Sequence, residues 1–362
     1  MVQLVSVFSN VLGALTSINV FLHVWFLGYY NRKKLIRFLI GLALAGLNFY
    51  GTREIFSTPG MALLTFSAAL IGMDLIGLLI RLFGKSRLHA FYRKMIRRGF
   101  AFLAAFLYVV YGLVNFHAVR KTEYSVESAN APRPFIVGLV SDSHMGTAMD
   151  DEKLVSIIRR VIDDGADVLV LAGDIVDENT ERDMFLRFAE DMKTVRAPKG
   201  IYFVFGNHDA SRWSRNITRA EMEEALTLAG VTVLTDESVL LDDWLRIAGR
   251  KDANDDRIPP DRLLSGADVK NEFILMIDHQ PAETKALSEA GVNLLLSGHT
   301  HNGQIFPVNL ISRVFGINEI EYGQKKIGSM NAVVSSGVSG WGSAFRTAGK
   351  SEYVLIKVEP DG

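Results

Sequence analysis

The chain has 362 residues, no cysteine and a formal net charge of −1, so it contains no disulfide and is longer than one average domain. This small net charge is the sum of two unlike parts: the first 117 residues carry 12 Lys and Arg against two acidic residues, and the rest carries 27 basic and 38 acidic residues. A basic, apolar front and an acidic back argue against one uniform soluble domain and favour a membrane unit joined to a soluble one.

Four apolar stretches fill the front part of the chain, at residues 2–29, 34–50, 61–83 and 99–117. A membrane-spanning helix needs about 20 mainly apolar residues. The first and third stretches meet this length and the fourth nearly does, whereas the second requires Arg37 to extend to the interface. We therefore expect an anchor of about four transmembrane helices over residues 1–118. Because no Lys or Arg precedes Arg32, we expect the first stretch to be an uncleaved anchor.

Basic residues gather in two of the connections between these stretches, at residues 32–37 and 81–98, whereas the middle connection has only Arg53 against Glu54. By the positive-inside rule, the two basic connections are cytoplasmic and both termini lie outside. We therefore expect a multi-pass protein of the cell (inner or plasma) membrane, with the bilayer as a partner and an extracytoplasmic C-terminal domain. No nucleic-acid partner is expected.

Asp74 is the one acidic residue inside a predicted span. An intramembrane carboxylate is a candidate functional site. The alternative is a buried polar contact within the helix bundle, or a position near the interface, and its role stays open.

Residues 119–134 are polar and end in Ala-Pro-Arg-Pro, which predicts a linker. In residues 135–362, short apolar runs alternate with amphipathic segments, as is typical of an α/β domain. Helices are predicted at 150–163, 184–193 and 220–229. Strands are predicted at 135–140, 167–171, 200–205, 273–277 and 292–296, with closing strands at 332–334 and 353–358. The runs at 231–234, 238–241 and 245–248 are expected to form a more antiparallel sheet.

Residues of metal-ligand type follow five of these predicted strands at their carboxyl ends, where open α/β sheets place their chemistry. They are Asp142, His144, Asp174, Asn207, His208, His279, His299 and His301. A single Asp-x-His is more often chance than chemistry, and Gly-Asp is common in turns. Five such sites together predict a shared metal centre.

The donor set indicates which metals are expected. Imidazole, carboxylate and amide donors without a thiolate suit Mn²⁺, Fe or Zn²⁺. Seven candidate ligands are too many for one tetrahedral ion. They fit two divalent ions about 3.5–4 Å apart, bridged by a carboxylate and a water. Asp174 is the best bridging candidate, because it stands alone on a tight turn between the two ligand groups.

The series Ser-Asp-Ser-His, Ala-Gly-Asp-Ile-Val-Asp, Gly-Asn-His-Asp, His-Gln-Pro and Ser-Gly-His-Thr-His resembles the calcineurin-like metallophosphoesterases, and among them the membrane-attached bacterial branch. The resemblance covers roughly residues 134–360. It implies the metallo-dependent phosphatase fold, in which two packed β-sheets are flanked by helices.

The resemblance also implies roles for individual residues. The first metal ion would be bound by Asp142, His144, Asp174 and His301. The second would be bound by Asp174, Asn207, His279 and His299. His208 would be the non-ligand histidine beside the leaving group. Asp209 could orient His208 or raise its pKa, or it could be a helix cap or turn residue.

One position departs from the family pattern, and another is a candidate match to it. Many relatives read Gly-His-Thr-His-Gly-Gly-Gln, and Asn302 replaces the first of the two adjacent glycines, which affects the local backbone or a substrate contact. The turn at 335–342 resembles a family loop followed by a substrate-side arginine. Arg346 is the matching candidate, and the alternative is a solvated surface arginine.

Together these patterns predict a membrane-anchored hydrolase of a phosphomonoester, phosphodiester or diphosphate, with a lipid-linked substrate favoured by proximity to the bilayer. The expected nucleophile is a hydroxide that bridges the two metal ions, which lower the pKa of the shared water. A histidine can protonate the leaving oxygen near neutral pH. The alternative is a non-catalytic metal-binding sensor or scaffold on a membrane anchor.

Overall fold

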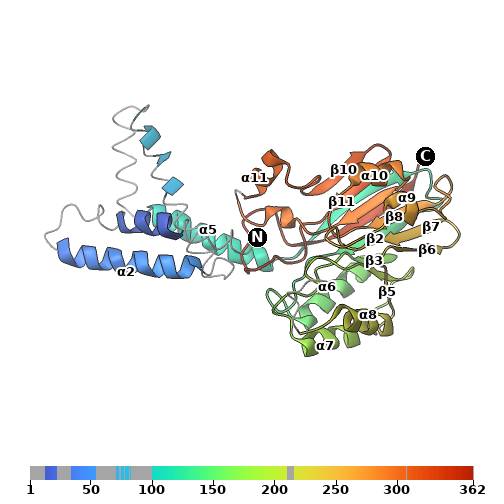
Figure 1. Ribbon diagram of the computed structural model, residues 1–362, viewed down its shortest axis with the longest axis horizontal. Helices are drawn as coiled ribbons and strands as arrows, with labels where there is room; N and C mark the ends of the chain where they lie inside the picture. Colours follow the sequence, from blue (N-terminus) through green and yellow to red (C-terminus); the bar gives the residue numbers. More distant parts are fainter. Residues whose placement is uncertain are drawn as a thin grey trace. The chain divides into compact units, whose positions relative to one another are not determined.

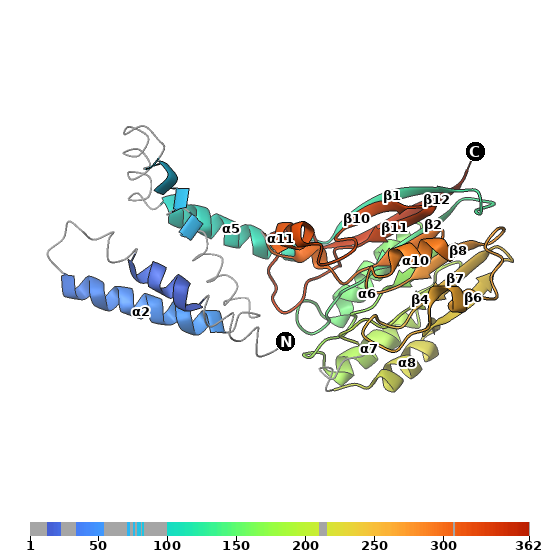
Figure 2. The same cartoon turned by 45° about the horizontal axis from the view of Figure 1, so that its top comes forward.

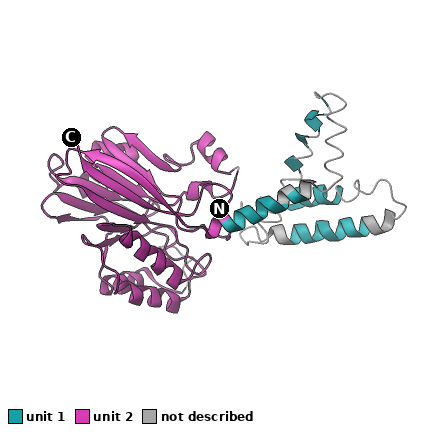
Figure 3. Ribbon diagram, turned by 180° about the vertical axis from the view of Figure 1, so that it is seen from behind, with its two compact units in different colours: residues 1–114 teal, residues 115–362 magenta. Residues whose placement is uncertain are grey.

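The computed structural model describes residues 13–22, 34–53, scattered positions between 71 and 82, and 100–361 apart from 210–215 and 307. The chain divides into two compact units, Met1–Val114 and Asn115–Gly362 (Figure 3).

The described apolar segments of the first unit are helical. Residues 13–22 form a helix, α2 spans Lys34–Arg53, and α5 spans Phe100–His117, with its last turn in the second unit. Asn48 Nδ2 donates hydrogen bonds to the hydroxyls of Thr16 and Ser17, at 2.9 and 3.0 Å, so polar groups of two helices satisfy one another. Much of the predicted span at 2–29 and most of that at 61–83, including Asp74, lie outside the described residues.

Among the helices in the described part of the chain, none is both long enough and apolar enough to cross a membrane.

The second unit contains two six-stranded sheets (Figures 1 and 2). The first sheet has the order β1-β12-β2-β3-β4-β5, with bounds Arg120–Ser128, Glu352–Pro360, Phe135–Val140, Val168–Leu171, Ile201–Phe203 and Val231–Val233. The second has the order β10-β11-β9-β8-β7-β6, with bounds Gly323–Ile327, Met330–Val334, Leu294–Ser297, Phe273–Ile277, Leu245–Gly249 and Glu237–Leu241.

Strand direction decides where the site can form. Strands β2, β3, β4 and β5 are parallel to one another, and so are β7, β8, β9 and β11. The carboxyl ends of neighbouring parallel strands therefore meet at one edge of each sheet. The expected antiparallel sheet over 231–248 is wrong in part. β5 pairs in parallel with β4, whereas β6 and β7 form an antiparallel pair in the other sheet. An apolar run of three to five residues predicts a strand, but it does not show which other strand that strand pairs with.

Three buried apolar clusters hold the layers together. One lies between the first sheet and the helices α6 (Asp151–Asp163), α7 (Arg182–Met192) and α8 (Arg219–Leu228). A second joins the two sheets, and a third joins the second sheet to α9 (Pro260–Leu263) and α10 (Thr284–Glu289). The expected α/β fold of two packed sheets flanked by helices is thus confirmed.

Helix α6 illustrates why these segments are helical. Its N-cap residue, Asp150, accepts a hydrogen bond from Lys153 N at 2.8 Å, which satisfies one of the free N–H groups of the first turn. The predicted apolar face is buried and consists of Leu154, Ile157, Ile158 and Val161.

The segment 119–134, expected to be a linker, contains strand β1. This strand pairs in parallel with β12 over nine residue pairs, Arg120 to Ser128. Its sequence is polar because it lies at the edge of the sheet and buries only Val126 fully. Backbone pairing rather than apolar burial forms β1, so hydrophobic periodicity could not detect it.

Candidate metal centre

Each predicted metal-ligand residue lies just past the carboxyl end of a parallel strand. Asp142 and His144 follow β2, Asp174 follows β3, Asn207 follows β4, His279 follows β8, and His299 and His301 follow β9. The first three of these strands belong to one sheet and the last two to the other. The site therefore forms where the two sheets meet.

The backbone at these turns is unusual. Five of the seven predicted ligands have positive φ angles, namely Asp142 (54°), His144 (42°), Asp174 (53°), His299 (70°) and His301 (50°). A non-glycine residue in this region costs about 1–3 kcal/mol and persists only where the surroundings enforce it. Such clusters of strained residues are typical of functional sites.

Two glycines allow the backbone to approach the carboxylates. A Cβ at Gly206 would lie 2.2 Å from Asp174 Oδ1, and a Cβ at Gly298 would lie 2.2 Å from Asp142 Oδ2. Both distances are far below van der Waals contact, so any larger residue at these positions would displace a predicted ligand.

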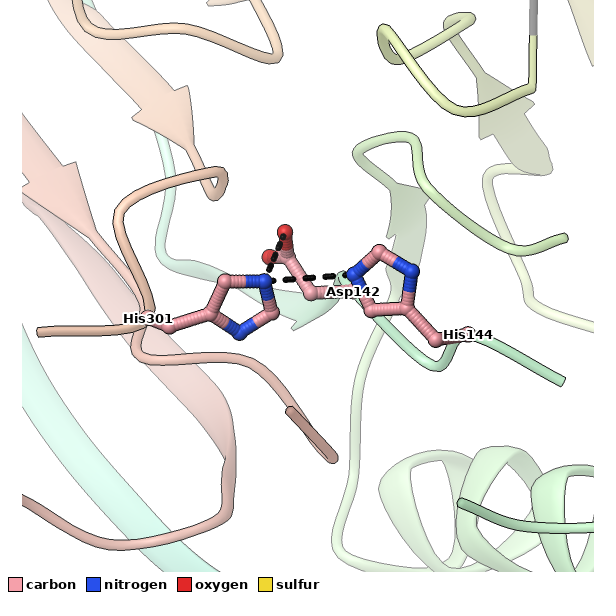
Figure 4. A group of neighbouring side chains, drawn as sticks. All are labelled: Asp142, His144 and His301. Atoms are coloured by element: carbon pink, nitrogen blue, oxygen red, sulfur yellow. Dashed lines mark hydrogen bonds and ion pairs between the residues drawn. The ribbon is translucent and has the colours of Figure 1, made fainter. Parts of the chain in front are cut away.

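The first group of donors consists of Asp142, His144 and His301 (Figure 4). His144 Nε2 and His301 Nε2 lie 3.2 Å apart, and His301 Nε2 lies 3.6 Å from Asp142 Oδ1. Two nitrogen ligands about 2.1 Å from a tetrahedral metal ion would lie about 3.4 Å apart. The spacing of these donors therefore fits one divalent cation.

The second group consists of Asp174, His279 and His299, with Asn207 beside it. Asp174 Oδ2 lies 3.2 Å from His279 Nε2, and Asn207 Oδ1 lies 3.3 Å from the same nitrogen. His279 Nδ1 lies 2.8 Å from the carbonyl oxygen of Ala172, the kind of contact that orients a metal-binding imidazole.

Asp174 connects the two groups. Its Oδ2 lies 3.9 Å from His144 Nε2 as well as 3.2 Å from His279 Nε2. Oδ1 accepts a hydrogen bond from His208 N at 2.8 Å, which fixes the carboxylate. Asp174 thus lies within reach of donors of both groups.

Burial controls the charge of these side chains. It lowers the pKa of His144 to about 3 and that of His299 to about 4, and it also lowers the pKa of His301 well below its usual value. These imidazoles are therefore held neutral, the form that binds metal ions. Burial alone would raise the pKa of Asp174, but neighbouring His279 holds it below its usual range.

His208 lies beside the first group, with its ring centroid 5.0 Å from that of His144. Its Nδ1 lies 3.5 Å from Glu178 Oε2. Burial lowers the pKa of His208, but the neighbouring carboxylates of Glu178, Asp174 and Asp209 together outweigh this and raise it above the ordinary value. Glu178 was not a sequence candidate. In the sequence, the only feature that could have identified Glu178 is its position four residues after Asp174, and this position does not indicate a tertiary contact with His208.

Asp209 does not contact the His208 ring through any of its described hydrogen bonds. Its buried carboxylate accepts from Asp174 N at 2.6 Å, Gly206 N at 2.9 Å and Val176 N at 2.9 Å. Asp209 therefore ties the turn that carries Asp174 to the turn that carries Asn207. These contacts match a turn residue rather than an orienting partner of His208, although the charge of Asp209 does help to raise the pKa of His208, as expected.

Arg346 is fully buried, and burial lowers its pKa to about 10. Its guanidinium donates to the carbonyl oxygens of His301 at 3.0 Å and Ser336 at 2.9 Å, and also to that of Ser339. Arg346 is therefore not a solvated surface arginine, and its donors face the backbone that carries His301.

Asn302 occupies the position of a family glycine and has φ of 49°. Asparagine tolerates this left-handed conformation better than most residues. Its side-chain oxygen accepts a hydrogen bond from Arg313 Nη2 at 3.0 Å, so Asn302 adopts the backbone of a glycine and adds a contact to α11 (Val308–Phe315).

Comparison with known proteins agrees with this geometry. Residues 135–303 match the model of the family described as calcineurin-like phosphoesterase. An uncharacterized metallophosphoesterase of Aquifex aeolicus is 28% identical over 273 residues, covering 71% of this chain and 98% of that protein. A transmembrane protein with a metallophosphoesterase domain from Danio rerio is 31% identical over 269 residues, covering 68% of this chain and 59% of that protein.

An uncharacterized metallophosphoesterase of Helicobacter pylori is 29% identical over 228 residues, covering 61% of this chain. The match spans 59% of the length of that protein, as it does for the Danio rerio relative. Over residues 135–303 the chain is therefore similar to the calcineurin-like metallophosphoesterases, and it carries a candidate binuclear metal site built from histidine and aspartate.

Proposed function

We propose that this protein hydrolyses a phosphomonoester, a phosphodiester or a diphosphate at a binuclear metal centre. The observation that carries this proposal is the position of the Asp174 carboxylate, 3.9 Å from His144 Nε2 and 3.2 Å from His279 Nε2, between two groups of donors. Such a carboxylate can serve both ions of a two-metal site.

The residues of the chain divide into three roles. Asp142, His144, His301 and Asp174 hold one ion, and Asp174, Asn207, His279 and His299 hold the other. When bound, the two ions supply an activated water and neutralise charge on the phosphoryl oxygens. His208 donates a proton to the leaving oxygen, and Glu178, 3.5 Å from its Nδ1, holds the ring in position.

The proposal is tested by loading the purified full chain with Mn²⁺ and measuring hydrolysis of p-nitrophenyl phosphate and bis-p-nitrophenyl phosphate. Asp174→Asn and His208→Ala should each reduce turnover more than about tenfold, since acid–base groups contribute roughly 10²–10⁴. Asp183→Asn, an exposed residue of α7, is the matched control and should be unaffected. A chain that binds two metal ions but hydrolyses neither ester would instead favour the sensor or scaffold.

We also propose that residues 1–118 anchor the protein in the cell membrane and that the catalytic unit is extracytoplasmic. Support comes from the basic connections of the sequence and from apolar side chains that are exposed along α2 and α5. These side chains are Leu39, Ile40, Leu42, Leu44, Leu47, Leu103, Phe106, Leu107 and Val114. Cleavage of the catalytic unit by protease added to intact cells tests this orientation, and full protection would contradict it.

A lipid-borne phosphoester is the substrate class that proximity to a bilayer favours. Helix α11, which follows the ligand turn directly, supports this choice because it exposes an apolar face. The exposed side chains are Val308, Leu310, Ile311, Val314 and Phe315. An amphipathic helix can lie in the membrane interface with its apolar face among the lipid chains.

A further inference from the structure

Trp341 lies beside the histidine proposed to protonate the leaving group. The ring centroids of Trp341 and His208 are 5.5 Å apart with an interplanar angle of 47°. His208 in turn lies 5.0 Å from His144, a predicted metal ligand. Trp341 and His208 are both partly exposed, so a bound molecule can reach them.

The side chain of Gln304 holds the part of the loop that carries Trp341. Gln304 Oε1 accepts from Trp341 N at 2.9 Å, and Gln304 Nε2 donates to the carbonyl oxygens of Trp341, Ser343 and Phe345 at 3.2, 3.1 and 3.1 Å. A Cβ at Gly340 would lie 2.7 Å from the Gln304 amide, so the glycine permits this close packing.

Gln304 also belongs to the turn that carries two predicted ligands. Its N–H donates to the carbonyl oxygen of His301 at 3.0 Å, and its own carbonyl oxygen accepts from Thr347 N and Ala348 N, each at 3.0 Å. The position of Trp341 is therefore coupled to the position of His301. The backbone of Trp341 is therefore fixed before any ligand binds, which reduces the entropy cost of using its indole as a binding surface.

We propose that Trp341 forms a leaving-group subsite that binds a planar aromatic group, an aryl ring or a nucleobase, attached to the departing oxygen. The inference rests on the proposed function, because it takes the leaving oxygen to lie at His208. Atoms beyond that oxygen then lie within reach of the indole. Stacking on an aromatic side chain is worth about 1–3 kcal/mol per base, or about 5- to 150-fold in affinity. A quaternary ammonium group is less well matched, since such cations favour a cage of several aromatic faces.

Binding to the Mn²⁺-loaded full chain tests the subsite without requiring turnover. Phenylphosphonate and methylphosphonate differ only in their organic group, and their dissociation constants are measured by calorimetry. We expect the wild-type protein to bind phenylphosphonate about tenfold more tightly. Trp341→Ala should abolish this preference, Trp341→Phe should retain most of it, and both variants should keep their metal content.

Leu228→Ala is the control, since it removes a large apolar side chain that is 70% exposed on α8. It should leave the preference unchanged. Equal affinity of the wild type for both phosphonates would overturn the subsite, as would an equal loss of both affinities in Trp341→Ala. A phenyl preference that depends on Trp341 in a protein without hydrolytic activity would keep the subsite and reject the proposed hydrolysis.

Discussion

The carboxylate of Asp174 and the imidazole of His279 lie 3.2 Å apart although they belong to different sheets. Asp174 follows β3 of the first sheet, and His279 follows β8 of the second. The apolar cluster between the sheets includes Val168 and Val170 of β3 and Leu275 and Ile277 of β8. The distance between the proposed metal ligands is therefore set by how the two sheets pack.

A first prediction concerns Gly206. Gly206→Ala would place a Cβ 2.2 Å from Asp174 Oδ1, so the carboxylate must move and turnover should fall more than about tenfold. Overpacking should also lower the free energy of unfolding by about 1–3 kcal/mol. Gly266→Ala, where nothing lies within 4 Å, is the control for both measurements. Equal activity of the two variants would contradict the proposed importance of the Asp174 position.

A second prediction concerns metal removal. Because the ligands converge only in the folded chain, the ions should bind the native state and stabilise it. At a free metal concentration of 1,000 times Kd, one site contributes about 4 kcal/mol. Chelation should therefore lower the unfolding temperature as well as abolish activity, and re-addition of Mn²⁺ should restore both. Asp142→Asn should show a smaller stabilisation by metal, and an unchanged one would argue against Asp142 as a ligand.

A third prediction assigns Glu178 a positioning role. Glu178→Gln removes the charge 3.5 Å from His208 Nδ1. We expect kcat to fall about tenfold with KM nearly unchanged, since the residue acts through His208 and not on substrate. Glu181→Gln, an exposed acid nearby in sequence, should have no effect. If Glu178 acts through His208, Glu178→Gln should not lower kcat further in a His208→Ala background. Additive losses of kcat in the double variant would contradict this positioning role.

A fourth prediction concerns Arg346. Arg346→Met leaves the buried carbonyl oxygens of His301, Ser336 and Ser339 without this donor. Each unsatisfied buried group costs about 1–3 kcal/mol, so we expect the free energy of unfolding to fall by about 3 kcal/mol or more. Denaturant unfolding measures the loss, with exposed Arg262→Met as control. A raised KM without a loss of stability would instead indicate substrate binding.

A fifth prediction concerns α11. Because the native chain has no cysteine, Val314→Cys and Leu228→Cys can each be labelled at a single site with a polarity-sensitive fluorophore. The two side chains are 72% and 70% exposed, but Leu228 lies on α8. In protein reconstituted into phosphatidylglycerol-containing vesicles, doxyl-labelled lipids should quench the label at position 314 and not at 228. Equal quenching at both positions would exclude α11 as an interfacial helix.

The sequence allowed the metal-ligand candidates to be predicted because a parallel strand delivers the residues that follow it to one edge of the sheet. Asp174 illustrates this, since the run Val168–Leu171 alone indicates where its side chain must lie. Contacts between turns could not be predicted from the sequence in the same way. Glu178 meets His208, and Gln304 holds the loop of Trp341, through tertiary packing that has no local pattern.

Strand β1 escaped prediction for a related reason. Periodicity detects strands that bury one face, whereas β1 is held by hydrogen bonds to β12 and exposes most of its side chains. Likewise, the polar character of Asp209 is compatible with several roles. Only its three backbone hydrogen bonds distinguish a turn residue from a partner of His208.

The early start of β1 limits how far the catalytic unit can travel. α5 ends at His117 and β1 begins at Arg120, so two residues separate them, and the Cα atoms of His117 and Arg120 lie at most about 11 Å apart in extended chain. With α5 held in a bilayer, as proposed, so short a connection would keep the second unit close to the lipid surface. It would then search for substrate in two dimensions, and its rate should follow the surface density of a lipid-borne ester rather than the bulk concentration.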